Sequence, residues 1–302
     1  MTIINSVIAG GAQPSGTKQI TTNGIHDVAG YANADVQVPT TAPAHYIEKT
    51  VDANGKLVNS SNFINLNGAT DLGKRVLYDA YNQNSLVSSI DFGSIITCSG
   101  EEACRLMCAD ATNLASVNWG ALSTVSGSRC FYNTFIRTKL TSVSISALES
   151  VSGSESFYGA FSEISTLTSF RCDALKSITG GYCFSYACSY CPNLTVISFN
   201  SLSVISNSTW CSAMTKSCSN LEHIYLGGLK ASTFSSRKDQ LYDLISSSAA
   251  SSSPNGCTVH FPSNFDPSDP NHTFDASTLT GYPTFGGNAS YIHVAFDLPA
   301  TE

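Results

Sequence analysis

Charged residues are scarce in this sequence. Asp, Glu, Lys and Arg make up 12% of its 302 residues, the formal net charge is −7, and no basic cluster is present. A positive field is what draws nucleic acids and anionic lipids to a protein surface. We therefore expect no nucleic-acid partner, and a neutral surface rich in Ser, Thr, Asn and Gly.

Long apolar runs are missing too. No stretch approaches the roughly 18 apolar residues of a membrane span. Residues Met1–Gly11 lack the basic start and the long apolar run of a secretory signal. These absences predict no membrane insertion and no secretion by the usual route.

Catalytic and cofactor motifs are equally hard to find. The sequence contains no GxSxG, HExxH or EF-hand pattern. Gly68–Lys74 has P-loop spacing, but Arg75 stands where a Ser or Thr would bind Mg²⁺. We predict no catalytic residues, no cofactor and no metal site, and hence a protein that is not an enzyme.

Eleven cysteines would suit a disulfide framework, but their positions indicate another role. Most occupy places that other copies of the repeat described below fill with Val, Phe or Ile, so we expect buried free thiols and folding inside a cell. Two alternatives stay open. One is a disulfide between Cys191 and Cys218, and the other is a zinc site at Cys188 and Cys191, which lacks a second ligand pair.

One pattern does recur from residue 87 to 229. Its copies are spaced by 27 residues, with a single spacing of 26, and begin at Val87, Leu114, Leu140, Leu167, Leu194 and Leu221. Each copy then carries apolar residues at fixed offsets, which in the first copy are Ile90, Phe92, Ile95 and Cys98. Equivalent residues of successive coils stack in a solenoid, so these columns should form its core.

The second half of each copy has two more apolar positions, four residues apart, as in Phe157 and Phe161. A spacing of four puts both side chains on one face of a helical turn, which predicts a short α- or 3₁₀-helical segment. Each coil would then contain one parallel strand and one helical turn, an α/β repeat. We expect Phe131, Phe157 and Phe184 to form one buried stack.

The repeat resembles the leucine-rich repeats of the BspA, or Treponema pallidum, type. The resemblance rests on Leu-x-x-[Val/Ile/Phe]-x-[apolar]-x-x-Leu-x-x-[Val/Ile], followed by an aromatic segment such as Ser156–Phe161. It implies a curved leucine-rich repeat solenoid of about six coils, with capping elements and a small β-rich N-terminal segment. We assign residues 87–231 to these repeats.

The N-terminal flank divides into two parts. Residues 1–58 are expected to be rich in β-hairpins, with strands in Thr17–Val28 and Ala34–Pro39 and a hairpin over Tyr46–Val58 that turns at its Asn-Gly pair. Residues 59–86 read as a degenerate copy of the repeat, which suits an N-terminal cap.

The C-terminal flank, residues 232–302, should complete the fold. An amphipathic helix is expected over Ser232–Ser248 as the second cap. Strands are expected at Cys257–Pro262 and Ser290–Pro299.

Residues between the inward positions of each strand form two outward rows on the concave sheet. The first row is Ser89, Ser116, Ser142, Ser169, Val196 and His223, and the second is Asp91, Asn118, Ser144, Arg171, Ser198 and Tyr225. Repeat proteins bind ligands through such extended sheets, and Arg and Tyr are favoured anchors. The second row, with Val196 and His223 of the first, is therefore the candidate binding site.

Both flanks resemble tail and virion proteins of bacteriophages and prophages of gut Firmicutes. The residues that carry this likeness are Thr17–Pro39, Tyr282–Gly287 and Phe296–Thr301. It implies a tail-associated protein of the virion, made in the bacterial cytoplasm, that binds a host cell-surface protein or glycan. The N-terminal segment would contact other tail proteins.

Two alternatives to this reading stay open. The chain could be a bacterial surface adhesin of the BspA type, which would need a secretion signal or wall anchor. It could also be a structural virion component whose repeats act as a spacer. The sequence identifies neither the receptor nor the oligomeric state.

Overall fold

The structure is a computed structural model. It describes residues 70–75, 77–85, 87–207, 209–230, 244, 256–265 and 292–300. Nearer the N-terminus it also describes the backbone of five short strands: β1 (Gln19–Thr21), β2 (Gly24–His26), β3 (Ala32–Asn33), β4 (Tyr46–Glu48) and β5 (Phe63–Asn65).

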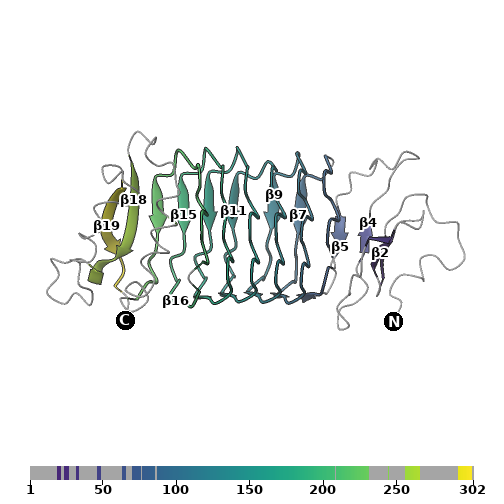
Figure 1. Ribbon diagram of the computed structural model, residues 1–302, viewed down its shortest axis with the longest axis horizontal. Coiled ribbons are helices and arrows are strands. Elements are labelled where there is room, and N and C mark those ends of the chain that lie inside the picture. Colours follow the sequence, from purple (N-terminus) through teal and green to yellow (C-terminus); the bar gives the residue numbers. More distant parts are fainter. Residues whose placement is uncertain are drawn as a thin grey trace, which may run out of the picture.

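The repeats form a parallel β-solenoid of about six turns, in which each coil contributes a short strand to each of two faces (Figure 1). We call the first the site face; its strands are β7 (Ser89–Asp91), β9 (Ser116–Asn118), β11 (Ser142–Ser144), β13 (Ser169–Arg171), β15 (Val196–Ser198), β17 (His223–Tyr225), β18 (Cys257–Pro262) and β19 (Ile292–Leu298). The second face consists of β6 (Asp71–Leu72), β8 (Thr97–Cys98), β10 (Thr124–Val125), β12 (Ser150–Val151), β14 (Ser177–Ile178) and β16 (Val204–Ile205). A short 3₁₀ segment, η2 (Ser263–Phe265), follows β18.

Strand pairing follows the register of the repeat. Val143 of β11 lies opposite Phe170 of β13, which lies opposite Ile197 of β15. These are equivalent positions of successive copies, and all three side chains are buried. The predicted stacking of equivalent residues in a solenoid is confirmed.

The aromatic core is continuous from coil to coil. The rings of Phe131 and Phe157 stack at a centroid distance of 5.0 Å, and those of Phe157 and Phe184 stack at 5.0 Å as well. All three side chains have no exposed surface. The predicted buried stack is therefore present.

The helical half of the predicted coil is wrong. Among the described residues of the repeats, the segments that carry these phenylalanines are turns. Every fourth residue has a left-handed backbone, as at Glu102 (φ 55°), Leu106 (φ 56°) and Asp110 (φ 58°). A spacing of four thus arises from successive four-residue turns, and we call this side of the solenoid the third face.

Hydrogen bonding explains why turns replace the helix. On the third face, alternate amides bond within the coil, as Met107 N–H does to Cys104 O, and the others bond to the next coil, as Leu106 N–H does to Tyr132 O. Parallel strands on the two sheet faces set the coils ~4.8 Å apart. An α-helix with side chains is about 10 Å wide, so it could stack at this spacing only if the solenoid curved.

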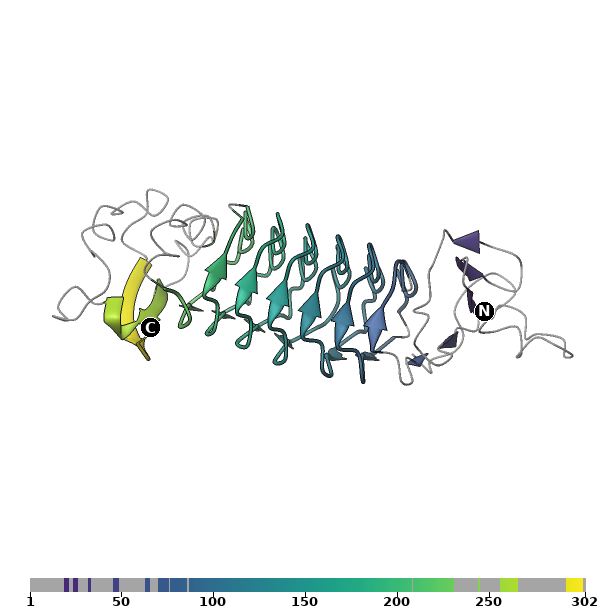
Figure 2. The same ribbon diagram turned by 90° about the horizontal axis from the view of Figure 1, so that it is seen from below.

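The coils accordingly lie along a nearly straight axis in both views (Figures 1 and 2). The curvature expected of the concave sheet is not visible in these views. We therefore describe the site face as a long, narrow surface along one side of the solenoid.

A column of glycines forms the corner between the second and third faces. A Cβ atom added to Gly127 would lie 2.2 Å from the carbonyl oxygen of Gly100, and one added to Gly153 would lie 2.1 Å from that of Gly127. The following Cys130 and Ser156 side chains donate to these glycine carbonyls. Only glycine permits so close an approach of successive coils.

The one short copy coincides with a break in sheet pairing. Three residues separate Asp110 from Leu114, but only two separate Arg137 from Leu140. The missing residue thus falls at the corner that leads into β11. β7 and β9 form a separate two-stranded sheet, whereas β11 begins the six-stranded one.

The flanks agree with the predicted strands in part. β18 has the predicted bounds and β19 lies within the predicted last strand. β1 and β2 form an antiparallel hairpin inside Thr17–Val28, which was expected to be a single strand. β4 pairs with β5, farther along the chain than the hairpin partner we predicted. The predicted cap helix lies outside the described residues except Leu244, which is helical and buried.

Candidate functional site

The C-terminal strands extend the site face beyond the last repeat. β17 pairs in parallel with β18, and β18 pairs in parallel with β19 (Figure 1). In this register His260 lies opposite Tyr225 and continues the second outward row. The register of β18 and β19 shifts between His260 and Pro262, and Asp297 lies at this irregularity.

Three side chains from these strands form a hydrogen-bonded chain. His260 Nδ1 lies 2.9 Å from both carboxylate oxygens of Asp297. His260 Nε2 lies 3.0 Å from His223 Nδ1. The His260 side chain is 10% exposed, and since both of its ring nitrogens have partners, its burial costs little.

Aromatic and cationic groups adjoin this chain. The Tyr225 ring stacks on the His260 ring at 4.3 Å and 13°. The Arg171 guanidinium lies 6.0 Å from the centroid of the Tyr225 ring, within the usual range of a cation–π contact. Arg171 can reach Tyr225 because the intervening residue of the row, Ser198, is small.

Asp173 contacts both Ser198 and Arg171. Its carboxylate accepts a hydrogen bond from the Ser198 hydroxyl and lies 3.8 Å from the Arg171 guanidinium. The Arg171 side chain remains 40% exposed. We call Arg171, His223, Tyr225, His260 and Asp297 the relay cluster.

The chemistry of this hydrogen-bonded chain determines which ring nitrogens donate and which accept. An ionised Asp297 only accepts hydrogen bonds, so His260 Nδ1 must carry a hydrogen. If both rings are neutral, His260 Nε2 accepts and His223 Nδ1 donates. His223 Nε2 is then an acceptor, and it has no partner among the residues that the structure describes.

The predicted site residues lie on the site face but divide into two groups. Arg171, Tyr225 and His223 belong to the relay cluster, with Ser198 and Val196 on the strand between them. Ser198 was expected to face solvent, yet it is fully buried because it lies between larger neighbours and bonds Asp173.

The other predicted residues lie toward the N-terminal end of the site face. Asn118 donates to Asp91 at 2.9 Å, and both side chains accept from backbone amides two residues on. Asp91, Asn118 and Ser144 are exposed. All three are thus on the predicted surface. Ser144 lies opposite Arg171 on the adjacent strand, whereas Asp91 and Asn118 lie on β7 and β9, apart from the cluster.

Sequence reasoning missed His260, Asp297 and Asp173. The spacing of the repeat could not find His260, which lies 35 residues after Tyr225 rather than 27. The alternation of inward and outward residues along the strand could have found His260. Val259 and Phe261 are inward residues, like Ile224 and Leu226 of β17, so His260 between them falls in the outward row.

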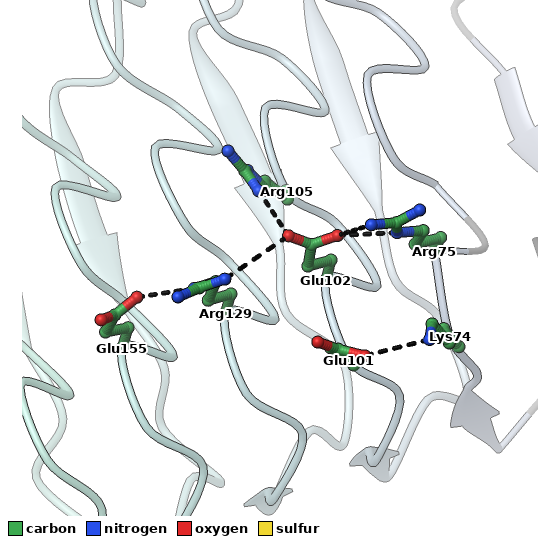
Figure 3. Close-up of polar contacts among 7 residues, drawn as sticks. All are labelled: Lys74, Arg75, Glu101, Glu102, Arg105, Arg129 and Glu155. Atoms are coloured by element: carbon green, nitrogen blue, oxygen red, sulfur yellow. Dashed lines mark hydrogen bonds and ion pairs between the residues drawn. The ribbon is translucent and has the colours of Figure 1, made fainter. Parts of the chain in front are cut away.

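A second polar cluster lies on the third face, around Glu102 (Figure 3). Its side chain is 3% exposed and pairs with Arg75 at 2.6 Å and with Arg105. Burial raises the pKa of the Glu102 carboxyl, but hydrogen bonds from Arg105 and Arg75 outweigh it, so the pKa is lowered. Arg129 lies 4.0 Å away and also pairs with Glu155. Every acid here has a basic partner, so we regard this cluster as structural.

The cysteines are buried and free, all eleven of them. The expectation of core thiols is confirmed, and the alternative disulfide between Cys191 and Cys218 is wrong. The Cys191 thiol donates to Phe161 O and the Cys218 thiol to Cys188 O. Burial raises the pKa of Cys183 and of Cys218 to about 12.

Two further features are absent from the described residues. No three His, Cys, Asp or Glu side chains there are gathered as metal ligands would be. Within the same residues, no helix has the length and apolar character needed to cross a bilayer.

Comparison with known proteins gave no relative. No protein-family model matches the chain, and no curated protein matches it. The features that indicate a function are therefore the fold, the relay cluster and the resemblances in the sequence.

Proposed function

We propose that this chain is a non-enzymatic binding protein that uses the site face to attach to a host cell surface. The observation that carries the proposal is the relay cluster. It places a half-exposed arginine and a tyrosine side by side on a face whose other strands bear mainly serine. Tyr and Arg dominate the binding energy of many interfaces because they offer large contact area and several donors.

The setting that we propose is a phage or prophage tail. The likeness of both flanks to tail proteins supports it, and the column pattern supports leucine-rich repeats of the BspA type. Residues 59–86 and 232–302 would then act as caps, and residues 1–58 would attach the chain to other tail proteins. A long solenoid suits this role because it holds a binding surface away from the point of attachment.

Adsorption to host cells tests the proposal. Purified protein carrying Arg171→Ala and Tyr225→Ala should bind cells at least about tenfold more weakly than the parent, as expected for two anchor residues. Tyr158→Ala is the matched control, because Tyr158 is a half-buried, stacked tyrosine on the third face. Unchanged adsorption of the double variant would refute binding through this cluster and favour a spacer role.

A bacterial surface adhesin is the second candidate. The same face and cluster would serve it equally well, so cell binding does not separate the two. Neighbouring genes do: tail-assembly genes beside this one favour the phage setting, and their absence together with export to the cell surface favours the adhesin.

A further inference from the structure

We propose that the relay cluster binds an anionic saccharide, one whose ring carries a carboxylate or a phosphate, and that it binds this ligand more tightly at acidic than at alkaline pH. The inference deepens the proposed function and depends on it for the location of the site. It goes further by naming the chemical class of the ligand and the group that controls its affinity.

The cation at the site is available to a ligand. The ion partner of Arg171 is Asp173, at 3.8 Å, which is longer than a charge-assisted hydrogen bond. The Arg171 side chain is 40% exposed, so its guanidinium donors can reach a ligand from solvent. A planar guanidinium matches carboxylate and phosphate oxygens with two parallel hydrogen bonds, which points to an anionic group.

The saccharide ring of the ligand is inferred from the residues around Arg171. Tyr225 offers an aromatic edge beside Arg171, and its own ring is stacked on His260 and fixed in place. The neighbouring strands carry Ser142, Ser144 and Ser169, whose hydroxyls can donate or accept. An anion on a ring that bears many hydroxyl groups fits these partners better than a purely apolar or purely charged ligand.

The number of hydrogens on the two histidine rings then sets the affinity of the site for the anion. With both histidines neutral, His223 Nε2 is an acceptor and repels the oxygen atoms of an anion. When the pair gains one proton, either ring can hold it, but in both arrangements His223 Nε2 carries a hydrogen. The site then offers a second donor and an added positive charge on β17, two strands from Arg171 on β13.

Asp297 is a positioning residue in this scheme. It contacts His260 rather than the ligand, and as a hydrogen-bond acceptor it keeps a hydrogen on Nδ1 of that ring. The other charged or titratable groups on the strands around the pair are Arg171 and Asp173 from the β13 segment, Tyr225 on β17 and His293 on β19. β15 contributes only Val196, Ile197 and Ser198.

The experiment measures binding of the full chain to three probes by calorimetry between about pH 5.5 and pH 8, the range in which histidine side chains generally change charge. The probes are an oligosaccharide containing glucuronic acid, the same oligosaccharide with its carboxyl groups reduced to alcohols, and a sugar phosphate. We expect the two anionic probes to bind about tenfold more tightly at the acidic end, since one charge-assisted hydrogen bond is gained. The reduced probe should bind weakly at both ends.

Two variants separate the contributions. Arg171→Ala should weaken the anionic probes at every pH, whereas Asp297→Asn should flatten the pH profile and leave affinity at the alkaline end nearly unchanged. Tyr158→Ala should behave as the parent protein does. The difference between the uronate and the sugar phosphate then identifies which anion the cluster prefers.

Two results would overturn the inference. One is equal affinity for the reduced and the acidic oligosaccharide, and the other is a pH profile that survives both His223→Gln and Asp297→Asn. Cell adsorption that requires Tyr225 but ignores pH and ligand charge would overturn this inference alone and leave the proposed function standing. Adsorption that does not require Tyr225 would overturn the proposed function itself.

Discussion

The aromatic stack allows a quantitative test of the solenoid core. Phe157 is fully buried and stacks on Phe131 and Phe184, each at 5.0 Å. Replacing a buried phenylalanine with alanine usually costs about 3–5 kcal/mol of folding free energy. Two stacked pairs, each worth about 0.5–1.5 kcal/mol, are lost at once, so we expect Phe157→Ala to lie at the upper end of that range.

Tyr158 supplies a control from the next residue along the chain. Its ring also stacks on an equivalent ring, that of Tyr132 at 4.9 Å and 4°, but it is half-buried on the third face. Tyr158→Ala should therefore cost only about 1 kcal/mol, because little apolar surface returns to water. Comparing the two variants separates the stability that comes from burying the ring from the stability that comes from stacking it.

Equilibrium denaturation followed by tryptophan fluorescence measures both costs. The chain has two tryptophans: Trp119 contacts Phe131, and Trp210 contacts Phe184, so they report on either side of the substituted residue. Because neighbouring coils stabilise one another, both probes should lose stability in Phe157→Ala. A cost for Phe157→Ala no greater than that for Tyr158→Ala would refute the buried stack.

Three further predictions follow from contacts elsewhere in the solenoid. Gly127→Ala should destabilise the fold by about 1–3 kcal/mol in denaturant, because the added Cβ would meet the Gly100 carbonyl, whereas Ser126→Ala on the exposed surface should be neutral. Glu102→Gln should cost about 1–3 kcal/mol at neutral pH, since it removes the buried carboxylate that pairs with Arg75 and Arg105. The lowered pKa of Glu102 means that this stabilisation is present above the carboxyl's ordinary value of 4.5 and is lost as pH falls through the lower folded value; a gap between parent and variant that stayed constant down to acidic pH would contradict this. A thiol reagent should react slowly with the folded protein and should find eleven thiols once it is unfolded, because burial raises the pKa of groups such as Cys183; rapid reaction of the folded protein would contradict this.

The columns of the sequence were sufficient to predict the core and the register. Val143, Phe170 and Ile197 were placed on adjacent strands by spacing alone, since equivalent residues must stack in a repeat fold. The third face was mispredicted because a spacing of four is shared by a helix and by successive tight turns. The spacing between coils, which excludes a helix in a straight solenoid, is a property of the assembled sheets and cannot be read from one copy.

The candidate site was predicted in part for a similar reason. Arg171, Tyr225 and His223 lie in the repeats, so their row and orientation followed from the register. His260 and Asp297 come from strands outside the period, and their contact with His223 depends on how β18 and β19 pair. The pairing of Asn118 with Asp91 likewise depends on a contact between two side chains, which the pattern does not encode.

Nitrogen NMR of the histidine rings tests most directly whether β17, β18 and β19 bring His223, His260 and Asp297 into one chain. The protein would be labelled at its six histidines, and the signals would be assigned with His223→Gln and His260→Asn. At about pH 8, where neutral rings dominate in general, we predict that both His223 and His260 carry their hydrogen on Nδ1 and that Asp297→Asn alters both signals. Rings that exchange freely between tautomers and do not respond to Asp297→Asn would contradict the assembled site.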